Sequence, residues 1–443
     1  MLGYYLRLSL KSLRRTPGLT ALMVCAIALG IAACIMTLTV YHTMSGNPIW
    51  WKNNVLYAVT MDSWEANLPY DPQRPTLPPW QLTYKDATYL QQSTIPKRSV
   101  IMTQLRGMLT GVAGQSLPLQ VLTRATTHDF FAMFDVPFEY GGAWRADADH
   151  GPQPVIVLSK KVNDTLFGGA DSVGRTVTWN GHRFRVAGVL AHWEPMPRFY
   201  DLIDNPSGFA PAEDVFVPFA WATTLQEMPS GNTDCPSAAS YETYRQFLGS
   251  ECVWTEMWVE LPSAASRDRF KAYMDAYWAA QHRAGRFPRP LDNRLTNVGQ
   301  WLQDFGVVSS DSRILLRVAF AFLAVCLINT VGILLTKFLR GAPVTGLRRA
   351  LGARRSQIFA QHIMEVSLVS LAGAMLGLAL GALGLLALRA LYAHNDLYGA
   401  ITHFDPLGVG WALALAALST LAAGLYPALS AGRLPPAVYL KSR

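Results

Sequence analysis

The sequence predicts an α-helical membrane protein with four transmembrane helices and a large α/β domain, outside the cytoplasm, inserted between helices 1 and 2. Composition is the first observation behind this fold class. Of 443 residues, 51% are hydrophobic and only 15% are charged, which is more apolar than a typical soluble protein. The second observation is a set of four long uncharged runs. The third is a polar segment of domain size between the first run and the second.

Each uncharged run is long enough to cross roughly 30 Å of hydrocarbon as a helix. The runs, which contain no Asp, Glu, Lys or Arg, cover residues 16–41, 318–336, 366–388 and 406–432. A basic lead precedes the first run, as it does in a signal peptide. However, the apolar stretch is longer than a signal h-region and no small-residue cleavage site follows it. We therefore expect an uncleaved membrane anchor.

Basic residues gather on one side of the predicted membrane. The N-terminal tail carries four, the loop at 337–355 carries six and the C-terminal tail carries three, with no acid among them. Since Lys and Arg near span ends stay in the cytoplasm, both termini are expected inside and the long polar segment outside. These segments account for the net charge of +8, so this charge does not indicate nucleic-acid binding.

The polar segment has the pattern of a mixed α/β domain. "TVTWNGHRFRVAGVL" predicts a hairpin, because Asn180 and Gly181 tolerate the positive φ angles of a type I′ turn. "PVIVLSKKVNDTLFGG" predicts a strand, an N-cap at Ser159, a short helix and Gly168 past its end. A further helix is expected at 265–284, and "NVGQWLQDFGVV" is expected to lead toward the second span.

Two cysteines, Cys235 and Cys252, lie in the outer segment, while the other three lie in spans. A disulfide between the two outer cysteines is expected if that side is oxidising, and closing so short a loop contributes about 3 kcal/mol. Two free thiols are the alternative. No metal-binding spacing such as CxxC occurs, so no metal site is expected.

Catalytic motifs are missing from the sequence. No lysine follows a glycine, so there is no phosphate-binding Walker loop, and HExxH and GxSxG are also absent. The four runs hold no ionisable residue, which an ion-coupled transporter needs at bilayer depth. We expect no catalytic residues and no aqueous conduit within this one chain.

Small residues mark a helix-packing seam in the third span. Gly373, Gly377 and Gly381 form a tandem GxxxG pattern, which places them on one face and lets two helix backbones approach closely. Glycine is also common in membrane helices without such a role. The seam's partner, a span of this chain or of another, stays open.

"GLRRALGARRSQIF", residues 346–359, sets four arginines and no acid between two apolar runs. In a continuous helix from about Val344 to Leu371, Leu347, Leu351 and Ile358 are expected to share a face. One interpretation is an amphipathic anchor on anionic lipid. The other is a knob that docks in a groove of a soluble partner, with arginines pairing with carboxylates at the rim.

Segments along nearly the whole chain resemble FtsX-like permeases, particularly MacB-like ABC transporter permeases. "GLRRALGARRSQIFAQHIMEVSLVSLAGAMLGLALG" is similar to their coupling helix and third span. "SLKSLRRTPGLTALMVCAIALGIA" and "AGLYPALSAGRLPPAVYLK" resemble their N-terminal entry and C-terminal end. "HDFFAMFDVPFEYGGAW", "VIVLSKKVNDTLFGG" and "VWTEMWVEL" resemble the MacB-type periplasmic core.

This resemblance implies a non-catalytic permease of a type VII ABC exporter in the inner membrane, with a periplasmic domain. Its partners are then a second permease subunit of the same or a related chain and a cytosolic ATPase dimer that binds ATP and Mg²⁺. A membrane-fusion protein, an outer-membrane channel and membrane lipid complete the expected partners; no cofactor in this chain is expected. The ATPase-coupling residues implied are Leu347, Arg348, Arg349, Ala350, Leu351, Gly352, Ala353, Arg354, Arg355 and Ile358.

The domains expected from these observations follow the chain in order. They are a cytosolic amphipathic segment (1–15), span 1 (16–44), the periplasmic core (45–309), span 2 (310–336), a cytosolic loop with the coupling helix (337–364), span 3 (365–388), a periplasmic loop (389–406), span 4 (407–430) and a cytosolic tail (431–443).

The sequence departs from the family in two places. MacB-like members usually have Glu-Ile-Gly where this chain has Val344, Thr345 and Gly346. The lost acid favours pairing with a different permease that carries the fuller motif. Some members also fuse the ATPase to the permease, whereas only fifteen residues precede span 1 here, so we expect the ATPase on a separate chain.

The function expected is mechanotransmission: ATPase-driven motion passes through the spans to the periplasmic domain and drives export of an amphiphilic compound, toxin or peptide. Lipoprotein extraction or regulation of cell-wall hydrolases in the same fold is the first alternative. Transmembrane signal sensing is a second. A membrane-anchored hydrolase is disfavoured because the sequence offers no nucleophile constellation.

Overall fold

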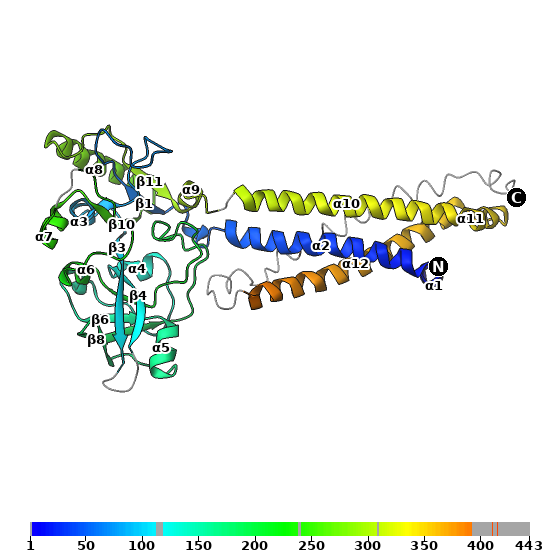
Figure 1. Cartoon of the computed structure of the whole chain (residues 1–443), viewed down its shortest axis with the longest axis horizontal. Coiled ribbons are helices and arrows are strands. Elements are labelled where there is room, and N and C mark those ends of the chain that lie inside the picture. The colour runs from blue at the N-terminus through cyan, green and yellow to red at the C-terminus, as the bar shows by residue number, and fades with distance from the viewer. Residues whose placement is uncertain are drawn as a thin grey trace. The chain divides into compact units, whose positions relative to one another are not determined.

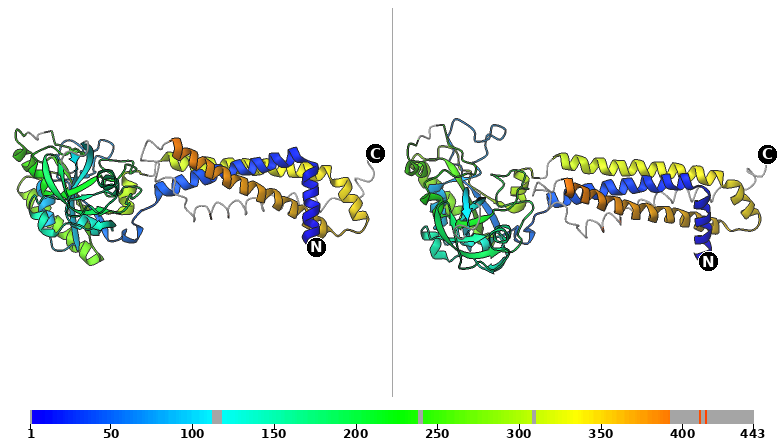
Figure 2. Two further views of the ribbon diagram at one scale, coloured as in Figure 1. Left: turned by 90° about the horizontal axis from the view of Figure 1, so that it is seen from below. Right: turned by 60° about the horizontal axis from the view of Figure 1, so that its bottom comes forward.

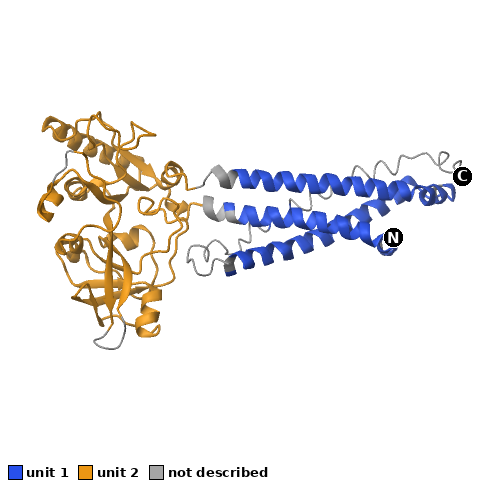
Figure 3. Ribbon diagram, viewed as in Figure 1, with its two compact units in different colours: residues 1–45, 308–443 blue, residues 46–307 orange. Residues whose placement is uncertain are grey.

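The chain divides into two compact units in the computed structural model (Figure 3): residues 1–45 with 308–443 form unit 1, and residues 46–307 form unit 2. The structure describes residues 2–111, 118–237, 241–307 and 310–391, together with residues 410 and 414. The fourth expected span, the loop before it and the C-terminal tail therefore lie almost wholly outside the described residues.

Unit 1 is built from long helices whose apolar length exceeds what a globular core needs. The helices are α1 (Leu2–Arg15), α2 (Pro17–Ser45), α10 (Ser310–Arg340), α11 (Ala342–Ala350) and α12 (Arg355–Leu391). Among the described residues, three helices are long and apolar enough to cross a membrane, over Pro17–Thr39, Ile314–Arg340 and Arg355–Leu388. α2 runs beside both α10 and α12 (Figures 1 and 2).

The glycines of span 3 lie against span 1 of the same chain. A methyl group at Gly377 would come within 2.9 Å of the Ala28 carbonyl oxygen and of Ile31 Cβ, and one at Gly373 within 2.7 Å of Ile27 Cγ2. At Gly381 the nearest atom, from Ile35, is 3.4 Å away. The tandem GxxxG face is therefore the surface on which α12 packs against α2, and this answers the question of its partner within the chain.

Unit 2 is organised by one sheet of 11 strands (Figure 1). Its main path runs β11-β1-β10-β3-β4-β9-β6-β8-β5, with β2 added on β10 and β7 on β3 and β8. Most neighbours are antiparallel, whereas β4 with β9 and β6 with β8 are parallel. The strands are Leu56–Thr60, Leu82–Thr83, Arg98–Thr110, Leu119–Thr126, Phe138–Gly141, Val155–Leu158, Thr176–Trp179, His182–Leu190, Val215–Pro218, Val253–Glu260 and Arg294–Asn297, β1 to β11 in that order.

Short helices cover this sheet and close its loops. They are η1 (Trp50–Lys52), α3 (Tyr84–Gln91), α4 (Asp129–Met133), η2 (Ala146–His150), α5 (Lys160–Phe167), α6 (Ala220–Thr224), α7 (Tyr244–Gly249), α8 (Ala264–Arg283) and α9 (Val298–Asp304). The core beneath them is rich in aromatic rings, among which Trp179, Trp254 and Phe216 are fully buried.

The local expectations for unit 2 are confirmed. Asn180 and Gly181, with φ angles of 45° and 79°, turn β7 into β8. The Ser159 side chain caps α5 by accepting from the Val162 N–H, and Gly168 ends that helix in the left-handed conformation. The helix expected at 265–284 is α8.

The sulfur atoms of Cys235 and Cys252 are bonded in this structure. Cys252 is buried directly before β10, and Asp234, beside Cys235, exchanges two backbone hydrogen bonds with Val253. The bridge therefore fastens a loop to the end of a central strand, 17 residues further along the chain.

A buried cluster of charges occupies the middle of unit 2. Arg124 on β4 donates through Nε to Glu213 at 2.9 Å and through its terminal nitrogens to Asp201 and Glu256. Arg198 adds a second guanidinium, whose Nη2 lies 2.8 Å from Asp201 Oδ2. Burial opposes ionisation of Glu213, but the two arginines hold the pKa of this carboxyl at about 2.

Asp204 lies beside this cluster, and among the described residues no ion pair joins it to an arginine. Its burial and the neighbouring charge of Asp201 raise the pKa of the Asp204 carboxyl to about 6. The pKa of the Glu256 carboxyl is also raised, to well above its usual range. Burial is the larger cause and the negative charge of Asp201 is the second. Unit 2 therefore holds groups whose ionisation opposes folding at neutral pH.

Candidate functional site

The segment between spans 2 and 3 is two helices joined by a tight turn, so the expected continuous helix from 344 to 371 is wrong. α11 ends at Ala350 and α12 begins at Arg355. Gly352 has a φ of +98°, a conformation that favours glycine. The Ala353 N–H donates to the Arg348 carbonyl oxygen at 3.0 Å, which is the long hydrogen bond of a Schellman helix end.

This turn holds an apolar tip, which we define as Val344, Leu347 and Leu351. Leu351 is 80% exposed, and Val344 and Leu347 are each 54% exposed. The three residues are spaced three and four apart, so those on α11 share one face. An exposed leucine of this degree is not used for packing within the described part of the chain. The apolar tip therefore has the geometry of a knob that awaits a partner.

Ile358 does not belong to that face. It is only 5% exposed and lies on α12, after the turn. The expectation that Ile358 lines up with Leu347 and Leu351 assumed one unbroken helix, and the glycine turn changes the direction of the chain between them. Ile358 is thus buried within unit 1 and is not part of the exposed apolar tip.

The arginines divide into different roles. Arg348 Nη1 donates to Gln361 Oε1 at 2.9 Å, so this side chain links α11 to α12. Arg354 and Arg355 are exposed at the start of α12, and Ala350 is exposed at the end of α11, while Ala353 is partly buried. The side chain of Arg349 lies outside the described residues. An exposed basic rim next to an apolar tip suits an acidic groove.

Sequence reasoning missed the connection behind the tip. Glu365, directly before the third uncharged run, forms a buried ion pair with Lys337 of α10 and accepts from Ser12 Oγ of α1 at 3.0 Å. One turn earlier, the Gln361 carbonyl accepts from Ser9 Oγ at 3.3 Å. The first turns of α12 are therefore bonded to α1, α10 and α11. The spacing of Gln361 and Glu365 was the available signal for this shared face.

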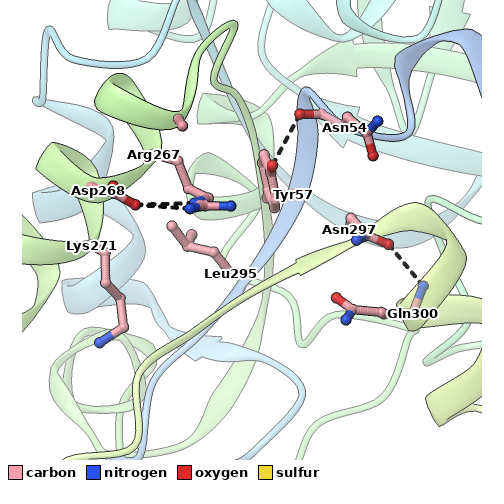
Figure 4. Close-up of a pocket in the computed structure, with 9 residues that line it drawn as sticks. Asn54, Tyr57, Arg267, Asp268, Lys271, Leu295, Asn297 and Gln300 are labelled. Atoms are coloured by element: carbon pink, nitrogen blue, oxygen red, sulfur yellow. Dashed lines mark hydrogen bonds and ion pairs between the residues drawn. The ribbon is translucent and has the colours of Figure 1, made fainter.

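Unit 2 also holds an open pocket of about 570 Å³ between the start of α8 and β11 (Figure 4). This volume falls in the range of small-molecule sites. Its lining residues contain no serine, cysteine or histidine: they are Asn54, Tyr57, Ala264, Arg267, Asp268, Lys271, Leu295, Asn297 and Gln300. Arg267 is already paired with Asp268 at 3.0 Å. The pocket offers polar contacts but no nucleophile with a base.

Membrane-length helices, a large α/β unit inserted after the first of them, and an exposed helical turn between the second and third together define a membrane permease of the kind that carries a large external domain. Family models agree with this class. Residues 20–277 match the MacB-like periplasmic core domain and residues 317–436 match the FtsX-like permease C-terminal domain. The chain belongs to the MacB-like and FtsX-like ABC transporter permeases, and its core domain is of the periplasmic type.

Individual relatives are distant. The macrolide export ATP-binding/permease protein MacB of Wolinella succinogenes is 24% identical over 319 residues, which is 72% of this chain and 43% of that protein. The pyoverdine export ATP-binding/permease protein PvdT of Pseudomonas aeruginosa is 22% identical over 96% of this chain and 56% of that protein. The chain thus spans about half the length of the curated relatives it matches.

Among solved structures, the periplasmic region of MacB from Actinobacillus actinomycetemcomitans matches with 13% identity and a TM-score of 0.36, over 58% of this chain and 94% of that one.

Proposed function

We propose that this chain is the permease subunit of a type VII ABC transporter, in which motion driven by a separate cytosolic ATPase dimer passes through the spans to the periplasmic domain. The observation that carries the proposal is the 80% exposed Leu351 at the apolar tip, held on helices that lead directly into the membrane. A docking knob must be exposed before its partner binds, and it must be backed by rigid structure.

The backing is supplied by the contacts of α12. A push on the tip reaches Gln361 through Arg348, and Gln361 and Glu365 connect to α1 and α10. The close backbone seam at Gly373, Gly377 and Gly381 then joins α12 to α2. α2 and α10 are also the helices that flank unit 2 in the chain. A displacement of the apolar tip can therefore pass through contacting helices to α2 and α10, the two helices that connect to the outer domain.

The apolar character of the spans favours transmission of motion over formation of an aqueous pore. The middle of α10, from 318 to 336, carries no charged residue, and its cysteine Cys326 is buried. Ala319 and Leu323 of α10 lie with Cys34 of α2 in one apolar cluster. An aqueous path for a solute needs polar lining. In this proposal ATP and Mg²⁺ belong to the ATPase subunits, both termini are cytosolic, and a second permease subunit completes the transporter in the inner membrane.

We further propose export as the process served, with an amphiphilic compound, toxin or peptide as cargo and with a membrane-fusion protein and outer-membrane channel as periplasmic partners. The support is that two relatives, MacB and PvdT, bear the names of exporters.

Leu351→Asp tests the proposal. The substitution is at an exposed position, so the chain should fold and reach the membrane, yet an acid at the apolar tip cannot enter an apolar socket. We expect the co-expressed ATPase to lose most of its coupling to export, measured as export at a fixed rate of ATP hydrolysis. Ser356→Asp, which adds the same charge at an exposed position on α12, should export normally. Undiminished export by Leu351→Asp would contradict the coupling role.

A further inference from the structure

Two tryptophans at the start of unit 2 face solvent instead of the core. Trp50 is 72% exposed and Trp51 is 55% exposed, and their rings meet edge to face with centroids 5.9 Å apart. Most large aromatic residues of unit 2 are buried, so this pair on η1 is unusual. Exposed apolar surface of this kind marks a contact with something that the isolated chain does not show.

The exposed pair is held rigidly. Lys52 Nζ lies 2.6 Å from Asp135 Oδ1 and 2.9 Å from the Met133 carbonyl oxygen, and Trp51 Nε1 donates to Asp135 Oδ2 at 3.0 Å. These contacts fix η1 on α4, whose residues Phe130 and Phe131 are buried in the core. The indole N–H of Trp50 has no hydrogen-bond partner among the described residues. The contacts of Lys52 and Trp51 with Asp135 and α4 therefore hold η1 in place, with the Trp50 ring exposed to solvent.

Both chain connections of unit 2 leave from the neighbourhood of this pair. Asn53 Oδ1, directly after η1, accepts from Asn47 Nδ2 and from the Gly299 N–H, each at 2.8 Å. Asn47 belongs to the link from α2, and Gly299 belongs to α9, which precedes α10. One side chain therefore ties together the two segments that enter and leave the membrane spans.

Chain length then limits how far Trp50 can lie from the bilayer. Trp50 is only five residues along the chain from Ser45, the last residue of α2, and a fully extended chain of this length spans at most about 18 Å. α2 itself continues six residues past Thr39, where its apolar window ends, which is about 9 Å of helix and enough to cross the headgroup layer. The link contains Pro48 and the Asn47–Asn53 contact, so it is not fully extended.

We propose that Trp50, supported by Trp51, inserts into the outer headgroup interface of the same bilayer that the spans cross, and fixes the outer domain on the membrane surface. Tryptophan suits this depth because its ring is apolar while its N–H can donate to lipid carbonyl or phosphate oxygens. Phospholipid is the partner because the covalent link keeps this side chain within reach of the bilayer at all times. The inference requires only the membrane topology, so it stands apart from ATPase coupling.

The test uses tryptophan fluorescence of the full chain in nanodiscs that contain phospholipid brominated at acyl carbons near the headgroup. Bromine quenches only rings within contact distance. Trp411 lies in the expected fourth span, so the measurement is made in a Trp411→Phe background. We expect this protein to show a quenched component that falls clearly when Trp50→Phe is added, since phenylalanine does not emit at the excitation used. Trp50 is exposed, so this variant should fold normally, which circular dichroism checks.

Trp278→Phe is the matched control. Trp278 lies fourteen residues along α8 from Ala264, which lines the pocket beside Asn54, so it is about 21 Å from that end of the helix. This control should retain the full quenched component. The proposal fails if Trp50→Phe is quenched as strongly as wild type, or if Trp50 emission is instead quenched by aqueous iodide in nanodiscs without bromine.

Discussion

The buried ion pair between Lys337 and Glu365 gives the sharpest prediction about unit 1. Glu365 is 1% exposed and Lys337 is 8% exposed, so each charge depends on the other for its compensation. Removing one member of such a pair leaves an unpaired buried charge, which costs about 3–5 kcal/mol, while removing both is often nearly neutral. Lys337→Met and Glu365→Gln should each lower the free energy of unfolding by roughly that amount, and the double variant should recover most of it.

The chain supplies its own reporters for this experiment. Cys34 and Cys326 are buried free thiols in α2 and α10, so in a Cys25→Ser background their alkylation follows the opening of the helix bundle. Unfolding by increasing mole fraction of dodecyl sulfate in mixed micelles gives the free energies. Arg340→Met removes an exposed cation three residues along the same helix and should change little.

The pattern across variants decides the outcome. Additive losses in the double variant, or single variants as stable as wild type, would show that Lys337 and Glu365 do not depend on each other, and the proposed route from the apolar tip to α10 would lose its firmest link.

Two further predictions address the seam and the outer domain. Gly377→Ala places a methyl group 2.9 Å from the Ala28 carbonyl oxygen and should destabilise the helix bundle by about 1–3 kcal/mol in the same thiol assay. Gly332→Ala is the control and should have no such effect, because a methyl group there meets no neighbouring element within 4 Å. Equal effects of the two variants would refute the packing of α12 on α2 through its glycines. For the outer domain, an acid whose pKa rises on folding, as that of Asp204 does to about 6, adds stability below pH about 4 that is lost as the pH rises through 6. Asp204→Asn should therefore raise the melting temperature of the domain at pH 7 and leave it nearly unchanged at pH 4, and a lower melting temperature at pH 7 would contradict the raised pKa.

Much of the fold follows from local signals in the sequence. The uncharged runs predict the apolar helices, since crossing a bilayer requires about twenty apolar residues whatever the tertiary structure. Asn180-Gly181 predicts its hairpin and Ser159 its helix cap, because each depends on backbone conformations that few residues adopt.

The features that were not predicted depend on contacts between residues far apart in the sequence or on a single backbone angle. Nothing local pairs Arg124 with Glu213 or Lys337 with Glu365, which are brought together by tertiary packing. The left-handed Gly352 is a different case. Its place after Leu351 offered a helix-ending signal, but the regular spacing of Leu347, Leu351 and Ile358 outweighed it. The result was one helix predicted where two exist, with Ile358 assigned to the wrong face.

The most direct test of the account is a photocrosslinker placed at residue 351 in the full chain in living cells, with the crosslinked product identified by mass spectrometry. The same crosslinker at buried Ile358 serves as the control. We predict that position 351 crosslinks to a cytosolic protein with a Walker loop, and that position 358 crosslinks to no such protein. Crosslinking of position 351 to lipid alone would mean that the apolar tip is a membrane-surface anchor, and the proposed transmission of ATPase motion through it would be wrong.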